Sequence, residues 1–240
     1  RLTCHNNCND NGMCTSIGNI HNIYGDDYVT PAEGLVPWIE QYSKTIRPNE
    51  RNVYDKEIMD NIWKLVNESK KKPENMKGEL AGNINSSIRL DTTNPLLENF
   101  MQKVLPAFIS NHIESYGAPW RQVMKEGDQW NLESFWVNFQ KKHEFNPPHD
   151  HGGVYSFVIW LKIPTSYEEQ RKLPIAVDSN ADNHISNFAF TYTDILGKVK
   201  TFAYNMEKEA EGYMVMFPST LLHQVFPFYK SSGERISISG

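Results

Sequence analysis

Residues 145–164 read FNPPHDHGGVYSFVIWLKIP and indicate the fold more clearly than any other part of the chain. The run from Val154 to Ile163 is almost continuously apolar and rich in β-branched and aromatic side chains. Such a run is typical of a strand buried in a sandwich core. His149 and His151 stand at its head, where side chains two residues apart point to the same side. The stretch therefore predicts a buried β-strand whose entrance carries two convergent imidazoles.

The second half of the chain contains further, shorter segments with strand-like patterns of apolar residues. Residues 132–141 alternate between apolar and polar side chains, and turns rich in glycine, proline, serine and aspartate separate the later segments. We expect further strands at 132–141, 188–193, 198–204, 212–217, 223–228 and 235–239. Many short strands with polar turns indicate a sandwich or barrel rather than alternating strands and helices.

The first half has helical spacing instead. We expect helices at 35–42 and 53–70, and a third that begins at the Asn94-Pro95 cap and ends at Gly117. Pro106 should bend the third helix because proline removes a backbone hydrogen bond. The predicted organisation is a polar tail at 1–30, a helical support region at 31–120 and a β core at 121–240, with 31–240 as one compact domain.

The tail holds all three cysteines, Cys4, Cys8 and Cys14, so the body of the protein owes nothing to disulfides. The segment is compatible with a poorly ordered polar tail, with half of a growth-factor-like module, or with a zinc site that includes His5 or His21.

The bulk properties exclude some classes of protein. A net charge of −5 argues against a nucleic-acid partner, and the absence of an eighteen-residue apolar run argues against a membrane span. We expect a cytoplasmic protein that acts on a small molecule or a peptide. The sequence leaves the oligomeric state open.

A third histidine, His223, follows a later predicted strand and could close a triangle with His149 and His151. Neutral imidazoles suit Fe, Zn, Cu and Ni, and three protein ligands leave positions open for substrate or O₂. Asp150 is the alternative ligand, since non-haem iron sites commonly combine two histidines with one carboxylate. Strand alternation sends Asp150 to the opposite face, so we prefer three histidines, unless a bulge at Gly152-Gly153 turns the carboxylate inward.

Arg235 and Ser237 share one face of the last predicted strand, and Arg235 follows His223 by twelve residues. A guanidinium near the third ligand could grip a carboxylate with two parallel hydrogen bonds, to which the Ser237 hydroxyl could add another. The alternative is a surface ion pair of Arg235 with Glu234 or Glu211.

Other strand residues are candidates for the pocket wall. We expect Asn138, Gln140 and Tyr155 to line it, and we interpret Lys162 as a surface lysine rather than a second carboxylate anchor. Trp136, Trp160 and Phe226 are predicted to be core residues rather than ligand contacts.

These segments together resemble the 2-oxoglutarate- and Fe(II)-dependent oxygenases, especially a phage- and marine-microbe-associated branch distantly similar to prolyl hydroxylases. The resemblance rests on residues 145–164, 216–227 and 234–240. It implies a double-stranded β-helix (jelly roll, cupin-like) with helices packed on one sheet. It also implies that His149 and His223 bind Fe(II), that His151 takes the usual carboxylate position, and that Arg235 binds the C5 carboxylate of 2-oxoglutarate.

Two other functions remain open at this point. A cupin-like dioxygenase could use a three-histidine metal without 2-oxoglutarate, with the substrate itself chelating the ion. A non-catalytic jelly-roll module, such as a binding or viral structural protein, could carry the histidines incidentally. If the chain is the 2-oxoglutarate-dependent dioxygenase that the resemblance implies, Fe(II) and 2-oxoglutarate are its cofactors and O₂ is a co-substrate.

Overall fold

The structure is a computed structural model that describes residues 53–116, 130–177, 184–194 and 196–240. The predicted helix at 35–42, the cysteine-containing tail and Gly117 lie outside the described residues. The helical elements are α3 (Val53–Ser69), the 3₁₀ helix η2 (Pro95–Leu97), the π-helix η3 (Phe100–Val104), α4 (Leu105–Tyr116), α5 (Tyr167–Gln170), α6 (Pro174–Val177) and the 3₁₀ helix η5 (Lys208–Ala210). The strands are β1 (Ser87–Arg89), β2 (Trp136–Gln140), β3 (Asn146–His149), β4 (Tyr155–Lys162), β5 (Phe188–Thr193), β6 (Val199–Tyr204), β7 (Met214–Pro218), β8 (His223–Val225) and β9 (Arg235–Ser239).

Two antiparallel sheets face each other. One has five strands in the order β1-β2-β9-β4-β7, and the other has four in the order β3-β8-β5-β6. From β2 onward, successive strands alternate between the two sheets except for the β5–β6 hairpin, which lies within one sheet, and the first and last of these strands, β2 and β9, are neighbours. This is the strand order of a jelly roll, which confirms the predicted fold class.

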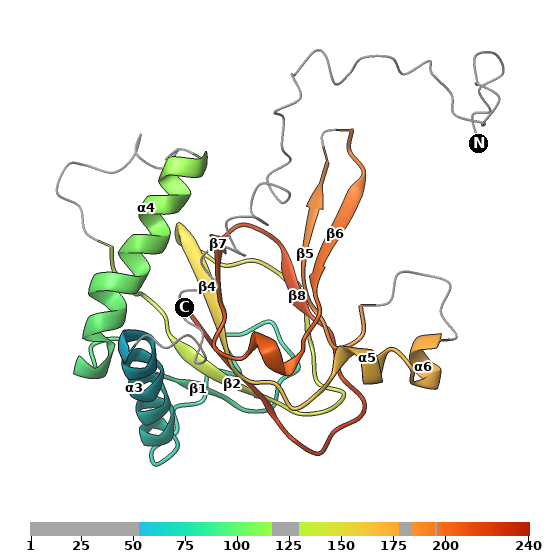
Figure 1. Cartoon of the computed structure of the whole chain (residues 1–240), viewed down its shortest axis with the longest axis horizontal. Helices are drawn as coiled ribbons and strands as arrows, with labels where there is room; N and C mark the ends of the chain where they lie inside the picture. The colour runs from blue at the N-terminus through green and yellow to red at the C-terminus, as the bar shows by residue number, and fades with distance from the viewer. Residues whose placement is uncertain (1–52, 117–129, 178–183, 195) are drawn as a thin grey trace.

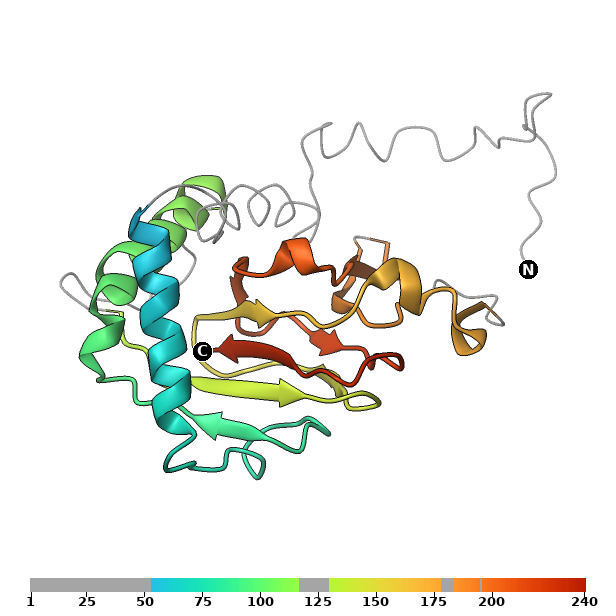
Figure 2. The same cartoon turned by 60° about the horizontal axis from the view of Figure 1, so that its bottom comes forward.

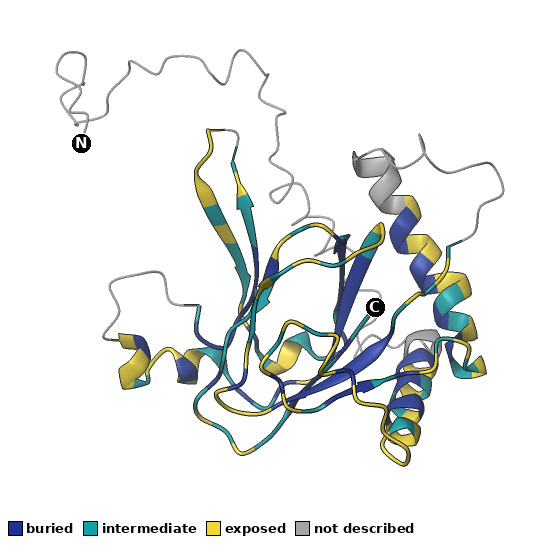
Figure 3. Ribbon diagram, turned by 180° about the vertical axis from the view of Figure 1, so that it is seen from behind, coloured by how far each residue is buried: buried dark blue, intermediate teal, exposed yellow. Residues whose placement is uncertain are grey.

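Helices cover the outer face of the five-stranded sheet (Figures 1 and 2). The rings of Phe100 and Phe157 meet there at 5.4 Å, which joins η3 to β4. Buried and exposed positions alternate along α3 (Figure 3), whose buried stripe is the predicted Ile58, Ile62, Leu65 and Val66. An amphipathic helix needs such a stripe to lie on a sheet.

The third predicted helix begins as expected but is not uniform. The side chain of Asn94 accepts a hydrogen bond from the Leu96 N–H, and Pro95 occupies the first turn. The π-helix η3 then ends with the Leu105 N–H bonded to the carbonyl of Phe100. Because Pro106 has no N–H to continue the α-helical ladder, the wider turn immediately before it absorbs the irregularity. The predicted bend is therefore a change of helix type.

Most predicted strands are present with shorter bounds, but β1 and β3 were not predicted. β1 is only three residues long, and β3 contains Pro147 and Pro148, which disfavour a central strand. β3 is an edge strand of its sheet, where missing N–H donors are tolerated. The prediction that His149 and His151 head one strand was wrong: His149 ends β3, and β4 begins only at Tyr155.

The segment before β1 closes the gap between the two sheets at one edge. The carbonyl of Ser86 accepts a hydrogen bond from the N–H of Phe139 in β2. On the other side, the N–H of Asn83 donates to the carbonyl of Phe145, next to β3. The cavity between the sheets is thus walled partly by residues that precede the jelly-roll strands. None of the described helices is both long and apolar enough to span a bilayer.

Candidate metal and cofactor site

The three predicted histidines come together between the sheets. The ring centroids of His149 and His223 lie 4.2 Å apart, and each lies 5.0 Å from that of His151. Their ligand atoms all lie within 4.8 Å of one another. His149 and His223 are direct partners in the β3–β8 register. The arrangement is compact enough for one ion to bind all three rings.

His151 reaches the cluster from a turn rather than from a strand. Its N–H donates to the carbonyl of Ser219, and the Ser219 N–H donates to the carbonyl of Val154. Gly153 has a φ of 89°, a left-handed backbone that glycine adopts without strain. The turn is therefore tied to the segment between β7 and β8, which also leads to His223.

Backbone carbonyls fix the tautomers of two imidazoles. Nδ1 of His149 lies 2.7 Å from the carbonyl oxygen of Pro147, and Nδ1 of His223 lies 3.0 Å from that of Leu221. A carbonyl can only accept, so each Nδ1 carries the proton and each Nε2 keeps a lone pair for a metal. This is the usual outer-shell arrangement of a metal-binding histidine.

The environment keeps the rings of His151 and His223 neutral. Burial, together with the nearby charge of His149, lowers the pKa of His223 to about 3 and that of His151 to about 4. At neutral pH both rings therefore offer unprotonated nitrogen. Imidazole nitrogens fit Fe(II), and three such protein ligands leave coordination positions for further ligands.

The metal-free protein should lose stability as the pH falls below about 6.5, the pKa of an unfolded histidine. Because folding lowers the pKa of His223, the unfolded chain binds more protons between pH 6.5 and about 3. In that window His223 alone reduces the free energy of unfolding by about 1.4 kcal/mol per pH unit. Urea unfolding in the presence of a chelator measures this slope. The variant His223→Gln should show a shallower slope, and an unchanged slope would contradict the prediction.

Asp150, the alternative ligand, does not join the three rings. It is exposed, and the ligand atoms that group together in the described residues come from the histidines alone. Its negative charge still reaches His151, where it partly opposes the fall in pKa. The ring of Trp136 approaches His151 edge-on at 5.6 Å and covers the side of the cluster next to β2.

Arg235 lies on the facing sheet and is buried, with 2% of its surface exposed. Its Nη2 donates to the carbonyl and to the hydroxyl of Ser186, both at 2.7 Å, and its Nη1 donates to Oε1 of Gln140 at 3.3 Å. The Phe228 ring packs against the guanidinium at 5.4 Å. Ser186 has a φ of 66°, a backbone conformation that costs roughly 1–3 kcal/mol outside glycine.

No carboxylate neutralises this guanidinium within the described part of the chain. Glu234 lies near Lys141 instead, and the carboxylate of Glu211 accepts the Ile163 N–H, so the alternative ion pairs of Arg235 do not form. The Nε of Arg235 is buried without a hydrogen-bond partner. Burial lowers the pKa of Arg235 to about 9, which still leaves it charged at neutral pH. A buried, uncompensated cation favours an anionic ligand.

One cavity joins the three histidines to Arg235. It is lined by Leu80, Ala81, Ile84, Trp136, Asn138, Gln140, Asn146, His149, His151, Ser156, Phe157, Val158, Trp160, Phe188, Phe217, His223, Val225, Arg235, Ser237, Ser239 and Gly240. The predicted Asn138, Gln140 and Ser237 are among them.

The cavity lining differs in part from the expected set. Tyr155 is not among the described residues that line the cavity, and its ring packs against Trp130 at 5.7 Å instead. Trp136 and Trp160 do line the cavity, although each is also buried like a core residue. Lys162 is exposed, as expected for a surface lysine.

Sequence reasoning also missed several contributors. Ser186 and the 80–84 segment carry no motif, and only their distant contacts bring them to the site. Asn146 was hidden in a proline-containing stretch that does not look like a strand.

Comparison with solved structures finds similar folds. A viral collagen prolyl hydroxylase from Paramecium bursaria chlorella virus-1, solved with 2-oxoglutarate, is 15% identical, with a TM-score of 0.44 over 75% of this chain and 88% of that one. A Pseudomonas putida prolyl-4-hydroxylase is 12% identical, with a TM-score of 0.43 over 77% and 84%. A 2OG-Fe(II) oxygenase family oxidoreductase from Burkholderia pseudomallei is 12% identical, with a TM-score of 0.47 over 85% and 87%. No curated protein matches the chain.

A family match covers the strands that build the site. Residues 134–240 match the family described as "Putative 2OG-Fe(II) oxygenase", a range that includes the three histidines and Arg235. Over this region the chain is similar to the 2-oxoglutarate- and Fe(II)-dependent oxygenases, enzymes whose cofactors are Fe(II) and 2-oxoglutarate.

Proposed function

We propose that this protein is a 2-oxoglutarate-dependent hydroxylase whose Fe(II) is held by His149, His151 and His223. The donor chemistry supports this assignment, because three imidazole rings lie together and two of them have tautomers fixed for metal binding. When bound, the iron supplies the activation of O₂ and couples the oxidative decarboxylation of 2-oxoglutarate to substrate oxidation. The chain itself supplies position, orientation and the exclusion of water.

Arg235 is the proposed anchor for the far carboxylate of 2-oxoglutarate. The observation that carries this proposal is a buried guanidinium that shares a cavity with the histidines and has no carboxylate partner among the described residues. A dicarboxylate with one end at the metal can neutralise it through charge-assisted hydrogen bonds. Gln140 and Ser186 hold the guanidinium in place, and Ser237 and Asn138 offer further polar groups along the same wall.

The substrate is proposed to be a small molecule or a peptide whose reacting part is uncharged. Among the described residues that line the cavity there is no aspartate, glutamate or lysine, and Arg235 is the only permanent cation. That cation is already assigned to the cofactor. Burying a substrate charge without a partner in such a cavity would be costly.

An anaerobic titration with Fe(II) tests the function directly. We expect a visible metal-to-ligand charge-transfer band to develop only when both Fe(II) and 2-oxoglutarate are present, because the keto acid must chelate the iron. Admission of O₂ should then bleach the band and release succinate and CO₂ slowly even without substrate. Binding of Fe(II) with no response to 2-oxoglutarate would favour the three-histidine dioxygenase that does not use it. Failure to bind Fe(II) would favour a non-catalytic module.

A further inference from the structure

The Asn138 side chain lies in the cavity wall and is hydrogen-bonded to a residue of the neighbouring strand. Asn138 is the middle residue of β2 and is buried, like its neighbours in that strand. Its Oδ1 accepts a 2.7 Å hydrogen bond from the hydroxyl of Ser87 in β1. Both residues are almost fully buried, at 6% and 3% exposed. A hydrogen bond in this dry environment restricts the side chain strongly.

This hydrogen bond determines which group of the Asn138 carboxamide remains available to a ligand in the cavity. With Oδ1 engaged by Ser87, the remaining hydrogen-bonding group is the Nδ2 amino group, which is a donor. Without the serine hydroxyl, the amide could rotate and present its oxygen instead, which would repel an anion. In the observed arrangement the Ser87 hydroxyl, by donating to Oδ1, holds the carboxamide in its donor orientation.

The position of Asn138 matches a ligand that spans the proposed site. Along β2 it lies between Trp136, which contacts His151, and Gln140, which holds Arg235. Cavity-facing residues two apart on a strand are separated by about 6–7 Å. A ligand that reaches from the histidines to the guanidinium must therefore pass Asn138.

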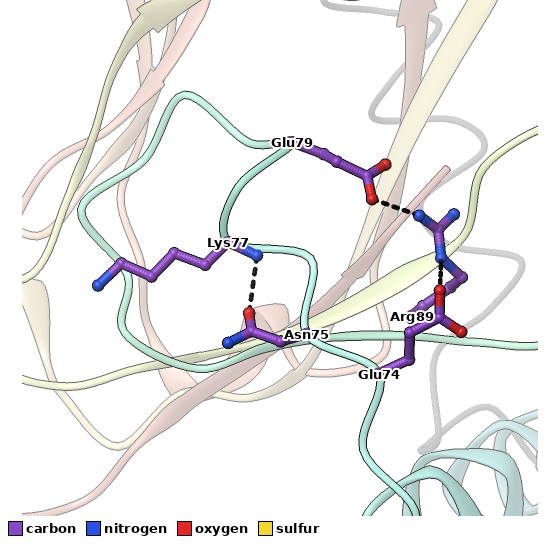
Figure 4. Close-up of polar contacts among 5 residues, drawn as sticks. All are labelled: Glu74, Asn75, Lys77, Glu79 and Arg89. Carbon is purple, nitrogen blue, oxygen red and sulfur yellow. Dashed lines mark hydrogen bonds and ion pairs between the residues drawn. The ribbon is translucent and has the colours of Figure 1, made fainter.

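The strand that carries Ser87 is fixed on its other side as well. The Ser87 carbonyl accepts the Met76 N–H, and Asn75 forms a β-bridge with Ile88. The Arg89 side chain pairs with both Glu74 and Glu79, which links β1 to the preceding loop (Figure 4). These ion pairs are partly exposed and contribute little individually, so the backbone contacts carry most of the constraint.

We infer that Ser87 is a positioning residue for 2-oxoglutarate, acting through the Asn138 carboxamide. The inference rests on the proposed function, and it extends the site beyond the matched residues 134–240. Asn138 Nδ2 donates a hydrogen bond to an oxygen of the bound keto acid, and Ser87 keeps that donor in place. Ser87 itself touches no ligand.

Removal of the hydroxyl tests the inference. In protein loaded with Mn(II), which replaces Fe(II) without supporting turnover, Ser87→Ala should raise the dissociation constant of 2-oxoglutarate about fivefold to tenfold, the usual effect of one lost hydrogen bond. Calorimetric titration measures this constant, and the affinity for Mn(II) should not change. In turnover with Fe(II), the KM for 2-oxoglutarate should rise while kcat at saturation is retained. The matched control is Ser86→Ala, since no described group is hydrogen-bonded to the Ser86 hydroxyl.

A second variant separates positioning from folding. Asn138→Asp keeps an acceptor for Ser87 but replaces the amino donor with an anionic oxygen, so it should bind 2-oxoglutarate more weakly than Ser87→Ala while melting near the wild-type temperature. In an Asn138→Ala background, Ser87→Ala should have no further effect on the dissociation constant, because residues in one network are not additive. If Ser87→Ala does not fold, the dissociation constant of 2-oxoglutarate is measured for Asn138→Asp, where it should be raised, and for Ser87→Thr, which keeps the hydroxyl and should bind like the wild type.

The outcomes separate the inference from the proposed function. If the wild-type protein binds 2-oxoglutarate and both Ser87→Ala and Asn138→Asp bind it equally well, the inference is overturned and the function stands. If the wild-type protein does not bind 2-oxoglutarate, the proposed function fails first. Independent, additive effects of the two substitutions would also overturn the role assigned to Ser87.

Discussion

Arg235→Gln is expected to reduce the affinity for 2-oxoglutarate by a hundredfold or more, on the order of what loss of a buried charge pair costs. The bound carboxylate would lose the one cationic partner that the described part of the cavity lining offers it. Metal affinity should be unaffected, because Arg235 lies on the sheet opposite His149 and His223. Calorimetric titration of the Mn(II)-loaded variant with 2-oxoglutarate, beside a titration of the apo variant with Mn(II), measures both effects.

Two controls accompany this prediction: a variant that keeps the positive charge but not the planar guanidinium, and the unfolding temperature of the ligand-free variant. Arg235→Lys keeps a positive charge but loses the planar fork, so its affinity should lie between those of the wild type and Arg235→Gln. The ligand-free Arg235→Gln protein should unfold at nearly the wild-type temperature, because removal of an uncompensated buried charge offsets the lost contacts to Ser186 and Gln140. Unchanged 2-oxoglutarate affinity in Arg235→Gln would contradict the anchor assignment.

The second large effect is expected at the metal. His223→Ala should weaken Fe(II) binding by well over a hundredfold, since even outer-shell partners of a metal ligand are worth 10–100-fold. Activity should fall in parallel. Metal analysis after gel filtration and anaerobic Fe(II) titration both measure the loss. His184→Ala, at a histidine whose ring packs on Phe226 away from the cluster, is the matched control.

The same experiment decides between His151 and Asp150 as the third ligand. With three histidines, His151→Ala should lose Fe(II) as His223→Ala does, whereas Asp150→Ala should retain it because that side chain is exposed. The reverse result would show that the carboxylate turns inward on metal binding. Retention of the metal by all three single variants would refute the site altogether.

Much of the site could be predicted because β9 and β2 have clear alternation. In β9, Arg235 and Ser237 separate cleanly from Ile236 and Ile238, so one face is marked as polar. In β4 both faces are apolar, because helices cover one and the cavity lies on the other. The sequence of β4 therefore does not reveal which face is which, and Tyr155, expected in the cavity wall, packs against Trp130 instead.

Other features depend on contacts that no local pattern encodes. The histidines converge as predicted, but the route is a glycine-containing turn tied to Ser219 rather than one continuous strand. β1 has only three residues, and Ser87 acquires its role from a partner far along the chain. Ser186 reaches Arg235 from a loop whose sequence carries no hydrogen-bonding motif.

The edge closure by β1 also bears on how the protein folds. The Ser87–Asn138 bond joins residues 51 apart in sequence, and the Gln140–Arg235 bond joins residues 95 apart. Contacts between residues so far apart in sequence form slowly, because the entropy of closing the intervening loop is lost before the contact stabilises the chain. The binding site should accordingly be among the last parts of the molecule to assemble. During refolding, the recovery of 2-oxoglutarate binding would then mark the arrival of the native state and lag behind the return of β-sheet circular dichroism.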